Sequence, residues 1–131
     1  MKSHDPLIRA KKFQIEDARR RLGQIDTMIA DFERMAGDLD RDIAAEEERS
    51  GQSDPRHFAY PPLALAARTR RDNLRRSAED LKVQQEEARA ALAAAEAELA
   101  RVEAAGEMER AVRLEGPARR SAPRHIDTAR F

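Results

Sequence analysis

The chain has 131 residues, of which 38% are charged and only 4% are aromatic, and its 25 basic residues balance its 25 acidic ones. So few aromatic residues leave a compact globular core poorly supplied, and the absence of cysteine excludes disulfides and thiolate zinc ligands. Ala, Glu, Arg, Leu and Asp dominate, which is typical of coiled coils, so the composition predicts an elongated all-α protein.

The first residues contain no apolar run long enough for a signal peptide, and nowhere do eighteen apolar residues follow one another. We therefore expect a cytoplasmic protein that does not insert directly into a membrane.

A first helix is predicted over about 5–49, because apolar residues keep a heptad register there. The series at position a is Ile8, Ile15, Leu22, Ile29, Ala36 and Ile43, and the series at d is Lys11, Ala18, Ile25, Phe32 and Leu39. Lys11 alone interrupts this stripe. Leu7, Met28 and Met35 fall at g, so the apolar stripe is wider than a strict two-helix seam.

Helix-breaking residues are concentrated over 50–61, which predicts a turn. Ser50-Gly51 supplies a helix stop, Asp54-Pro55 disfavours helix at Asp54, and Pro61-Pro62 fits the first turn of a following helix.

A second helix of smaller seam residues is predicted over about 62–112. Position a falls on Ala64, Arg71, Ala78, Gln85, Leu92 and Leu99, and position d on Ala67, Leu74, Leu81, Ala88, Ala95 and Val102. With a turn of about a dozen residues, an antiparallel two-helix coiled-coil hairpin over 1–112 is the expected fold.

Charge selects the orientation and register of this hairpin. Residues 31–48 are rich in acids and residues 68–76 in bases, and an antiparallel pairing lays the two blocks side by side. Paired positions that add to about 110 place large residues against small ones, as with Phe32 and Ala78, and bring Lys11 and Lys12 near Glu96 and Glu98. A register shifted by one heptad stays open.

The sequence contains no motif for catalysis, cofactor binding or metal binding. A glycine-rich phosphate loop and HExxH are absent, and the three histidines, His4, His57 and His125, lie far apart in sequence. The many carboxylates are expected to form a solvated helix surface. We therefore predict a protein that is not an enzyme, with no catalytic residue, cofactor or metal.

Basic clusters at the two ends raise nucleic acid as an alternative partner. The neutral balance of the chain and the acidic blocks opposite these clusters argue against it, because phosphate binding needs a net positive face. Residues 113–131, interrupted by Gly116-Pro117 and Pro123, are expected to form a flexible, disordered basic tail.

Binding of protein partners suits the pattern better. The candidate partner-binding residues lie at the start of the first helix and in the turn: Leu7, Ile8, Lys11, Lys12, Phe13, His57, Phe58 and Tyr60. Phe58 and Tyr60 either fold back over the end of the coiled coil or contact a partner directly, and aromatic residues at a tip are efficient anchors when a partner buries them. Whether the hairpin stays monomeric is open.

Three stretches carry a family resemblance: the opening MKSHDPLIRAKKFQIEDARRRLGQIDTMIADFERM, the turn SDPRHFAYPP, and ARTRRDNLRRSAEDLK after it. Over residues 1 to about 105 the chain resembles the FliJ family of flagellar export proteins, in its alphaproteobacterial form. The turn and the opening carry most of the weight, because heptads recur in unrelated coiled coils.

This resemblance implies a component of the flagellar type III protein export apparatus, required for motility. Its implied partners are the flagellar export ATPase, the export gate membrane protein and export chaperones, with peripheral association at the flagellar base on the inner membrane. By analogy with the stalk of rotary ATPases, the open end of the hairpin would enter the ATPase ring and the turn end would reach toward the gate. The alternative is a structural or adaptor coiled coil, associated with nucleic acid through its basic ends.

Overall fold

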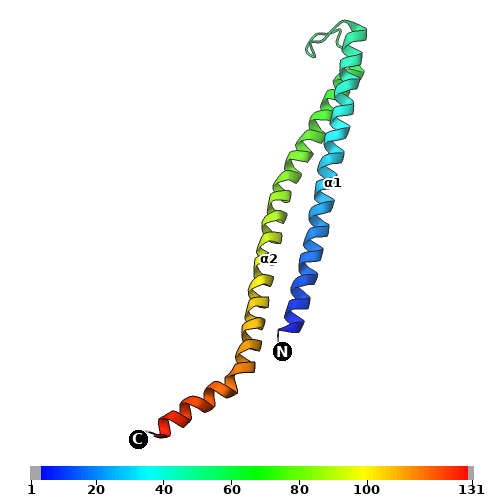
Figure 1. The fold of residues 1–131 in the computed structure, drawn as a ribbon. Coiled ribbons are helices and arrows are strands. Elements are labelled where there is room, and N and C mark those ends of the chain that lie inside the picture. The colour runs from blue at the N-terminus through cyan, green and yellow to red at the C-terminus, as the bar shows by residue number, and fades with distance from the viewer. Residues whose placement is uncertain (1–3, 130–131) are drawn as a thin grey trace. The chain divides into compact units, whose positions relative to one another are not determined.

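The computed structural model describes the backbone of residues 4–129 and the side chains of residues 4–114. The described residues form two helices, α1 over Asp5–Ser50 and α2 over Pro62–Ala129, which pack against each other as an antiparallel hairpin (Figure 1). The predicted all-α hairpin is therefore confirmed. The helix α2 continues to Ala129, beyond the predicted end near residue 112. The side chains of 115–131 lie outside those described, and the expectation of a flexible tail over 113–131 stays a prediction.

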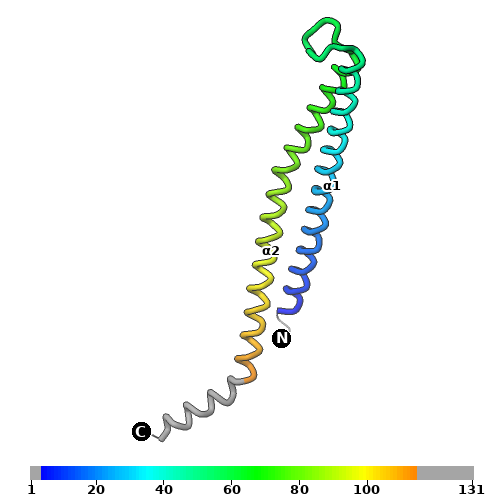
Figure 2. Tube along the Cα trace, turned by 45° about the horizontal axis from the view of Figure 1, so that its top comes forward, coloured from blue at the N-terminus to red at the C-terminus, as the bar shows by residue number. Residues whose placement is uncertain are grey.

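The loop between the helices covers residues 51–61 and returns the chain from α1 to α2 (Figure 2). Gly51 ends α1 with a φ of 73°, and its N–H donates to the carbonyl oxygen of Glu47 at 2.9 Å. This left-handed residue after the last helical turn is the usual way in which glycine stops a helix.

Contacts divide the hairpin into two compact units, which we describe separately. The turn unit comprises Arg19–Ala90 and includes the loop, and the open-end unit comprises residues 1–18 and 91–131. The core of the turn unit is formed by Ile25, Ile29 and Leu81, with Phe32 and Ala88 packed against them. In the open-end unit Ile15 is buried.

The heptad pattern explains which side chains are shielded from solvent. Every position that the two predicted series place at a or d is buried or half-buried. Lys11 fits this rule as well, because the aliphatic part of its side chain, its stem, lies in the seam while its Nζ pairs with Glu98 Oε1 at 2.6 Å. The stripe at g behaves differently, since Leu7 and Met28 are exposed.

The predicted register is also confirmed, separately in each unit. In the turn unit Leu81 lies in one cluster with Ile25 and Ile29, and Gln85 Nε2 donates to Asp26 Oδ1 at 2.7 Å, at positions that add to 111. In the open-end unit Lys11 pairs with Glu98, at positions that add to 109. A shift by one heptad would change these values by seven, so the alternative register is excluded.

One edge of the turn unit, which we call the ladder edge, carries a row of ion pairs between e positions of the two helices. Arg68 lies 3.9 Å from Glu47, Lys82 lies 3.1 Å from Glu33, and Arg75 pairs with Asp40. This is the meeting of acidic and basic blocks that the sequence predicted. Such exposed pairs contribute little stability individually, but they favour this register over others.

Asp40 is the best-connected acid of the ladder edge. It accepts hydrogen bonds from Arg75 and, at 3.0 Å, from Arg71 Nη1. The hydrogen bond from Arg75, followed by that from Arg71, lowers the pKa of Asp40 below its ordinary value, although partial burial opposes the shift. Arg71 occupies an a position in the seam, so its bond to Asp40 keeps a seam charge paired.

Candidate partner-binding site at the turn

The loop between α1 and α2 is held by short-range hydrogen bonds. The side chain of Asp54 accepts from the N–H of Arg56 at 3.0 Å, and its carbonyl oxygen accepts from the N–H of His57 at 3.0 Å. An aspartate that bonds the backbone two residues on is a common turn former. The side chain of Asp54 therefore helps to form the turn that the sequence predicts over 50–61.

A second turn follows at once and is centred on His57. Its carbonyl oxygen accepts from the N–H of Tyr60 at 3.0 Å, and its Nδ1 accepts from the N–H of Ala59 at 3.0 Å. Because Nδ1 acts as an acceptor, the imidazole has a defined orientation. The loop thus presents its side chains from two consecutive hydrogen-bonded turns.

Tyr60 faces inward and closes the end of the hairpin. It is 6% exposed, and its hydroxyl donates a hydrogen bond to Glu47 Oε2 at 2.6 Å. Burial, and then the neighbouring Glu47 carboxylate, raise the pKa of the Tyr60 hydroxyl above its ordinary value. Glu47 also faces Arg68, so α1, the loop and α2 are joined through one carboxylate.

Phe58 faces outward and is 95% exposed. Its ring stacks on that of His57, with centroids 4.7 Å apart and an angle of 25° between the planes. The side chain of Arg56 is also almost wholly exposed. We call Arg56, His57 and Phe58 the tip. It combines an aromatic ring, an imidazole and a guanidinium on a backbone whose turns are fixed by hydrogen bonds.

The two aromatic residues of the turn therefore have different roles. Sequence reasoning left open whether Phe58 and Tyr60 cover the coiled coil or contact a partner. In the structure Tyr60 covers the end of the seam, and Phe58 is free to contact another molecule. Tyr60 is better described as a structural residue of this site than as a contact residue.

The other five predicted residues lie in the open-end unit and divide between the seam and the surface. Ile8 and Lys11 are half-buried in the seam, and the hydrogen bond from Lys11 lowers the pKa of Glu98. Leu7, Lys12 and Phe13 are exposed, with Phe13 at 69%. The surface residues are thus the ones that a partner can reach without opening the hairpin.

Sequence reasoning missed three residues of the turn site. Glu47 and Arg68 form the polar network around Tyr60, and Arg56 belongs to the tip. Glu47 and Arg68 both occupy e positions, so the heptad labels contained a signal for their pairing. Nothing in the pattern indicated that the Tyr60 hydroxyl would join them.

Comparison with protein-family models, curated proteins and solved structures gives no match. A function for this chain is therefore inferred from its residues and from the resemblance described above.

Over residues 4–114, no group of three or more His, Cys, Asp or Glu side chains is arranged so as to hold a metal ion. In the same part of the chain, no helix is both long and apolar enough to cross a membrane.

Proposed function

We propose that this protein is a non-enzymatic component of the flagellar type III protein export apparatus, which couples the export ATPase to the export gate and assists export chaperones. The observation that carries the proposal is the turn, whose sequence SDPRHFAYPP bears the resemblance and whose structure combines a buried Tyr60 with an exposed Phe58. Such an arrangement suits a protein that acts through contacts. Its place would be the cytoplasmic side of the flagellar base.

In this proposal each unit offers a separate contact surface. The tip supplies an aromatic anchor, and anchors of this kind contribute most when an apolar pocket of the partner buries them. The open-end unit offers Phe13, Leu7 and Lys12. By the stalk analogy, the tip would face the gate and the open-end residues would face the ATPase.

The nucleic-acid alternative invokes the basic ends of the chain, and the bases of the turn unit add little to it. Four of the basic residues that face acids across the hairpin, Arg68, Arg71, Arg75 and Lys82, have carboxylate partners within the same chain. Binding of phosphate there would require these pairs to be broken, which offsets the gain from counterion release. A mobility-shift assay at low salt tests the alternative, and a salt-sensitive shift would support it.

The proposed function is tested by deleting the gene and measuring swimming and filament secretion. We expect a poorly motile strain with reduced secretion, and we expect the purified protein to increase ATP hydrolysis by the flagellar ATPase. A motile deletion strain with normal filament secretion would refute the proposal.

The role of the tip is tested in the same strain by complementation with Phe58→Ser. The matched control is Val83→Ser, because Val83 is also an exposed apolar residue of the turn unit, at 60%, but lies on α2 away from the loop. We expect Phe58→Ser to reduce motility without changing the melting temperature, and Val83→Ser to change neither. Equal motility of the two variants would exclude the tip as a contact surface.

A further inference from the structure

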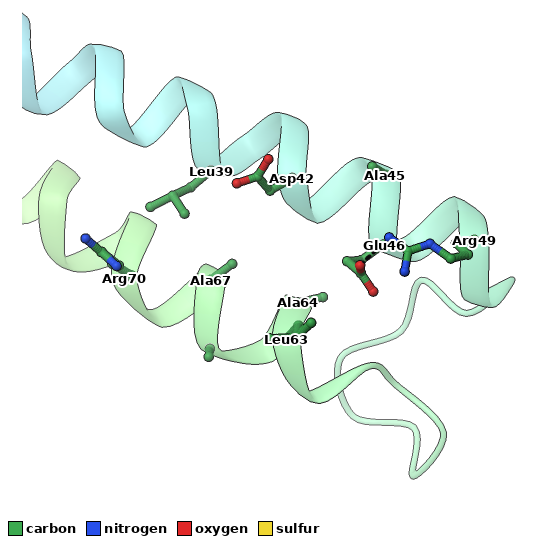
Figure 3. A pocket seen from close by; sticks show the side chains of 10 residues that line it. Leu39, Asp42, Ala45, Glu46, Arg49, Leu63, Ala64, Ala67 and Arg70 are labelled. Atoms are coloured by element: carbon green, nitrogen blue, oxygen red, sulfur yellow. Dashed lines mark hydrogen bonds and ion pairs between the residues drawn. The ribbon is translucent and has the colours of Figure 1, made fainter.

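A groove lies between the two helices of the turn unit, close to the loop (Figure 3). It has a volume of about 420 Å³, and its lining includes Leu39 and Ala45 of α1 and Leu63, Ala64 and Ala67 of α2. The alanines are too small to fill the space between the helix backbones. The result is a hollow at the surface of the hairpin, in which these apolar residues lie beside the charged Asp42, Glu46, Arg49 and Arg70.

Leu63 lies at the rim of this groove and is 72% exposed. A second hollow, lined by Met35 and Leu74 among others, shares Leu39 and Arg70 with the first. The two hollows thus join along this side, which we call the groove edge, and their apolar residues form a strip with charged residues beside it. The strip contains a protruding leucine and a depression, the elements of knobs-into-holes packing between helices.

The charges of the groove edge differ from those of the ladder edge. Asp42 of α1 and Arg70 of α2 both line the groove. Neither forms an ion pair or a hydrogen bond within residues 4–114, whereas acids and bases of the ladder edge pair with each other. The groove edge therefore presents one unpaired acid and one unpaired base, one from each helix.

We propose that the groove edge binds a second copy of this chain, giving a four-helix dimer through the turn units. A two-fold axis through the groove would present Asp42 of each copy to Arg70 of the other. The same operation would place each Leu63 against the apolar strip of the partner. A second copy thus satisfies both the charge pattern and the apolar pattern with the residues already present.

The dimer would also provide the burial that one hairpin lacks. Among residues 4–114 no large side chain is fully buried, since even the core residues Ile15 and Ile43 keep 4% exposure. Two hairpins packed along the groove edge would enclose a core on all sides, as four-helix bundles do. The tip and the open-end surface residues take no part, so this proposal does not depend on the export function.

The test measures the mass of the full-length protein in solution by sedimentation over a concentration range reaching about 100 μM, which would saturate a dimer with a Kd near 1 μM. We expect the wild type to change from monomer to dimer with increasing concentration. We expect Leu63→Glu to weaken the dimer about tenfold or more, because a charge would enter the apolar strip. Val83→Glu is the matched control and should leave the dimer unchanged.

Charge reversal tests the orientation of the two copies. Asp42→Arg and Arg70→Asp should each weaken the dimer, because each places like charges opposite one another, and the double variant should recover it. A wild type that stays monomeric at every concentration would overturn the proposal. So would equal dimerisation of Leu63→Glu and Val83→Glu, or a double variant no better than the single ones.

A different outcome would reassign the groove. If the wild type is monomeric and Leu63→Glu abolishes stimulation of the ATPase with an unchanged melting temperature, the occupant is another protein and the second copy is excluded. Circular dichroism of each variant at matched concentration ensures that a change in mass reflects the interface and not unfolding.

Discussion

Removal of one oxygen atom, in Tyr60→Phe, tests how the turn holds the hairpin together. The substitution keeps the buried ring and deletes the hydroxyl that donates to Glu47 at 2.6 Å. A hydrogen bond to a charged group contributes about 1.5–3 kcal/mol to the free energy of unfolding. Glu47 keeps Arg68 at 3.9 Å and its side chain is 21% exposed, so water partly replaces the lost donor. We therefore expect a loss near the lower limit, about 1.5 kcal/mol.

The measurement is urea unfolding followed by circular dichroism, together with the melting temperature, which should fall by roughly 5–10 °C for a chain of this size. Glu47→Gln and the double variant complete a thermodynamic cycle that isolates the Tyr60–Glu47 bond. Phe58→Ser serves as the control and should change stability by less than about 0.5 kcal/mol, because Phe58 is exposed. If Tyr60→Phe lowers the free energy of unfolding no more than this control does, the hydroxyl does not stabilise the turn and our account of it is wrong.

The pH dependence gives a second readout for the same residue. Because folding raises the pKa of Tyr60 above its ordinary value of 10.0, the protonated hydroxyl stabilises the folded state. This contribution is fully present below pH 10 and is lost as the pH rises through the higher pKa of the folded state. Tyr60→Phe should remove that alkaline loss, and an unchanged alkaline slope would show that it arises from other groups.

Three further expectations concern the backbone and the charged pairs. Gly51→Ala should lower the free energy of unfolding by about 1–2 kcal/mol, because a φ of 73° is strained for other residues. Gly37→Ala should raise it by about 0.8–1 kcal/mol, since a Cβ there meets nothing within 4 Å. Urea unfolding measures both changes, and equal effects would contradict the assignment of Gly51 as the helix stop. Asp40 has a lowered pKa in the folded state, so its stabilisation is present above its unfolded pKa and disappears as the pH falls through the lower folded value. Asp40→Asn should lack this pH-dependent stabilisation, which is below about 1 kcal/mol because the Asp40 side chain is 40% exposed. If the stability of both proteins falls identically with decreasing pH, this expectation is refuted. Lys11→Ala should destabilise the hairpin through loss of its packed stem, and the loss should persist at high salt, which screens its pair with Glu98; full recovery in salt would show that the charge alone matters.

The sequence allowed the helices, the seam and the register to be predicted because each follows from a local, repeated pattern. A period of 3.5 residues places Ile25 and Ile29 inside wherever the helix lies, and the charge blocks then favour one antiparallel register, with a shift by one heptad left open. The register needed no knowledge of side-chain conformations. The same reasoning explains why Lys11 remained in the seam, since the pattern set its position and its length allowed Nζ to reach Glu98.

The turn site could be predicted only in part, because no periodicity governs a loop. Which of two aromatic residues faces inward depends on the hydrogen bonds that Asp54 and His57 make to the backbone around them. The groove was missed for a related reason. Leu63 lies in the first turn of α2, and the hollow beside it exists because Ala45 and Ala67 are both small at the same level of the two helices.

The hydrogen bonds of the tip have a consequence for how this protein can change. Those around Phe58 are made by backbone groups or by the side chains of Asp54 and His57, and the Phe58 ring itself is 95% exposed and stacks on the His57 ring. Substitution of Phe58 therefore leaves the helices and their register unaffected, while Tyr60 and Glu47 continue to close the hairpin. Binding preference at this end can consequently diverge between lineages, or be redesigned, by exchange of a single side chain without cost to folding.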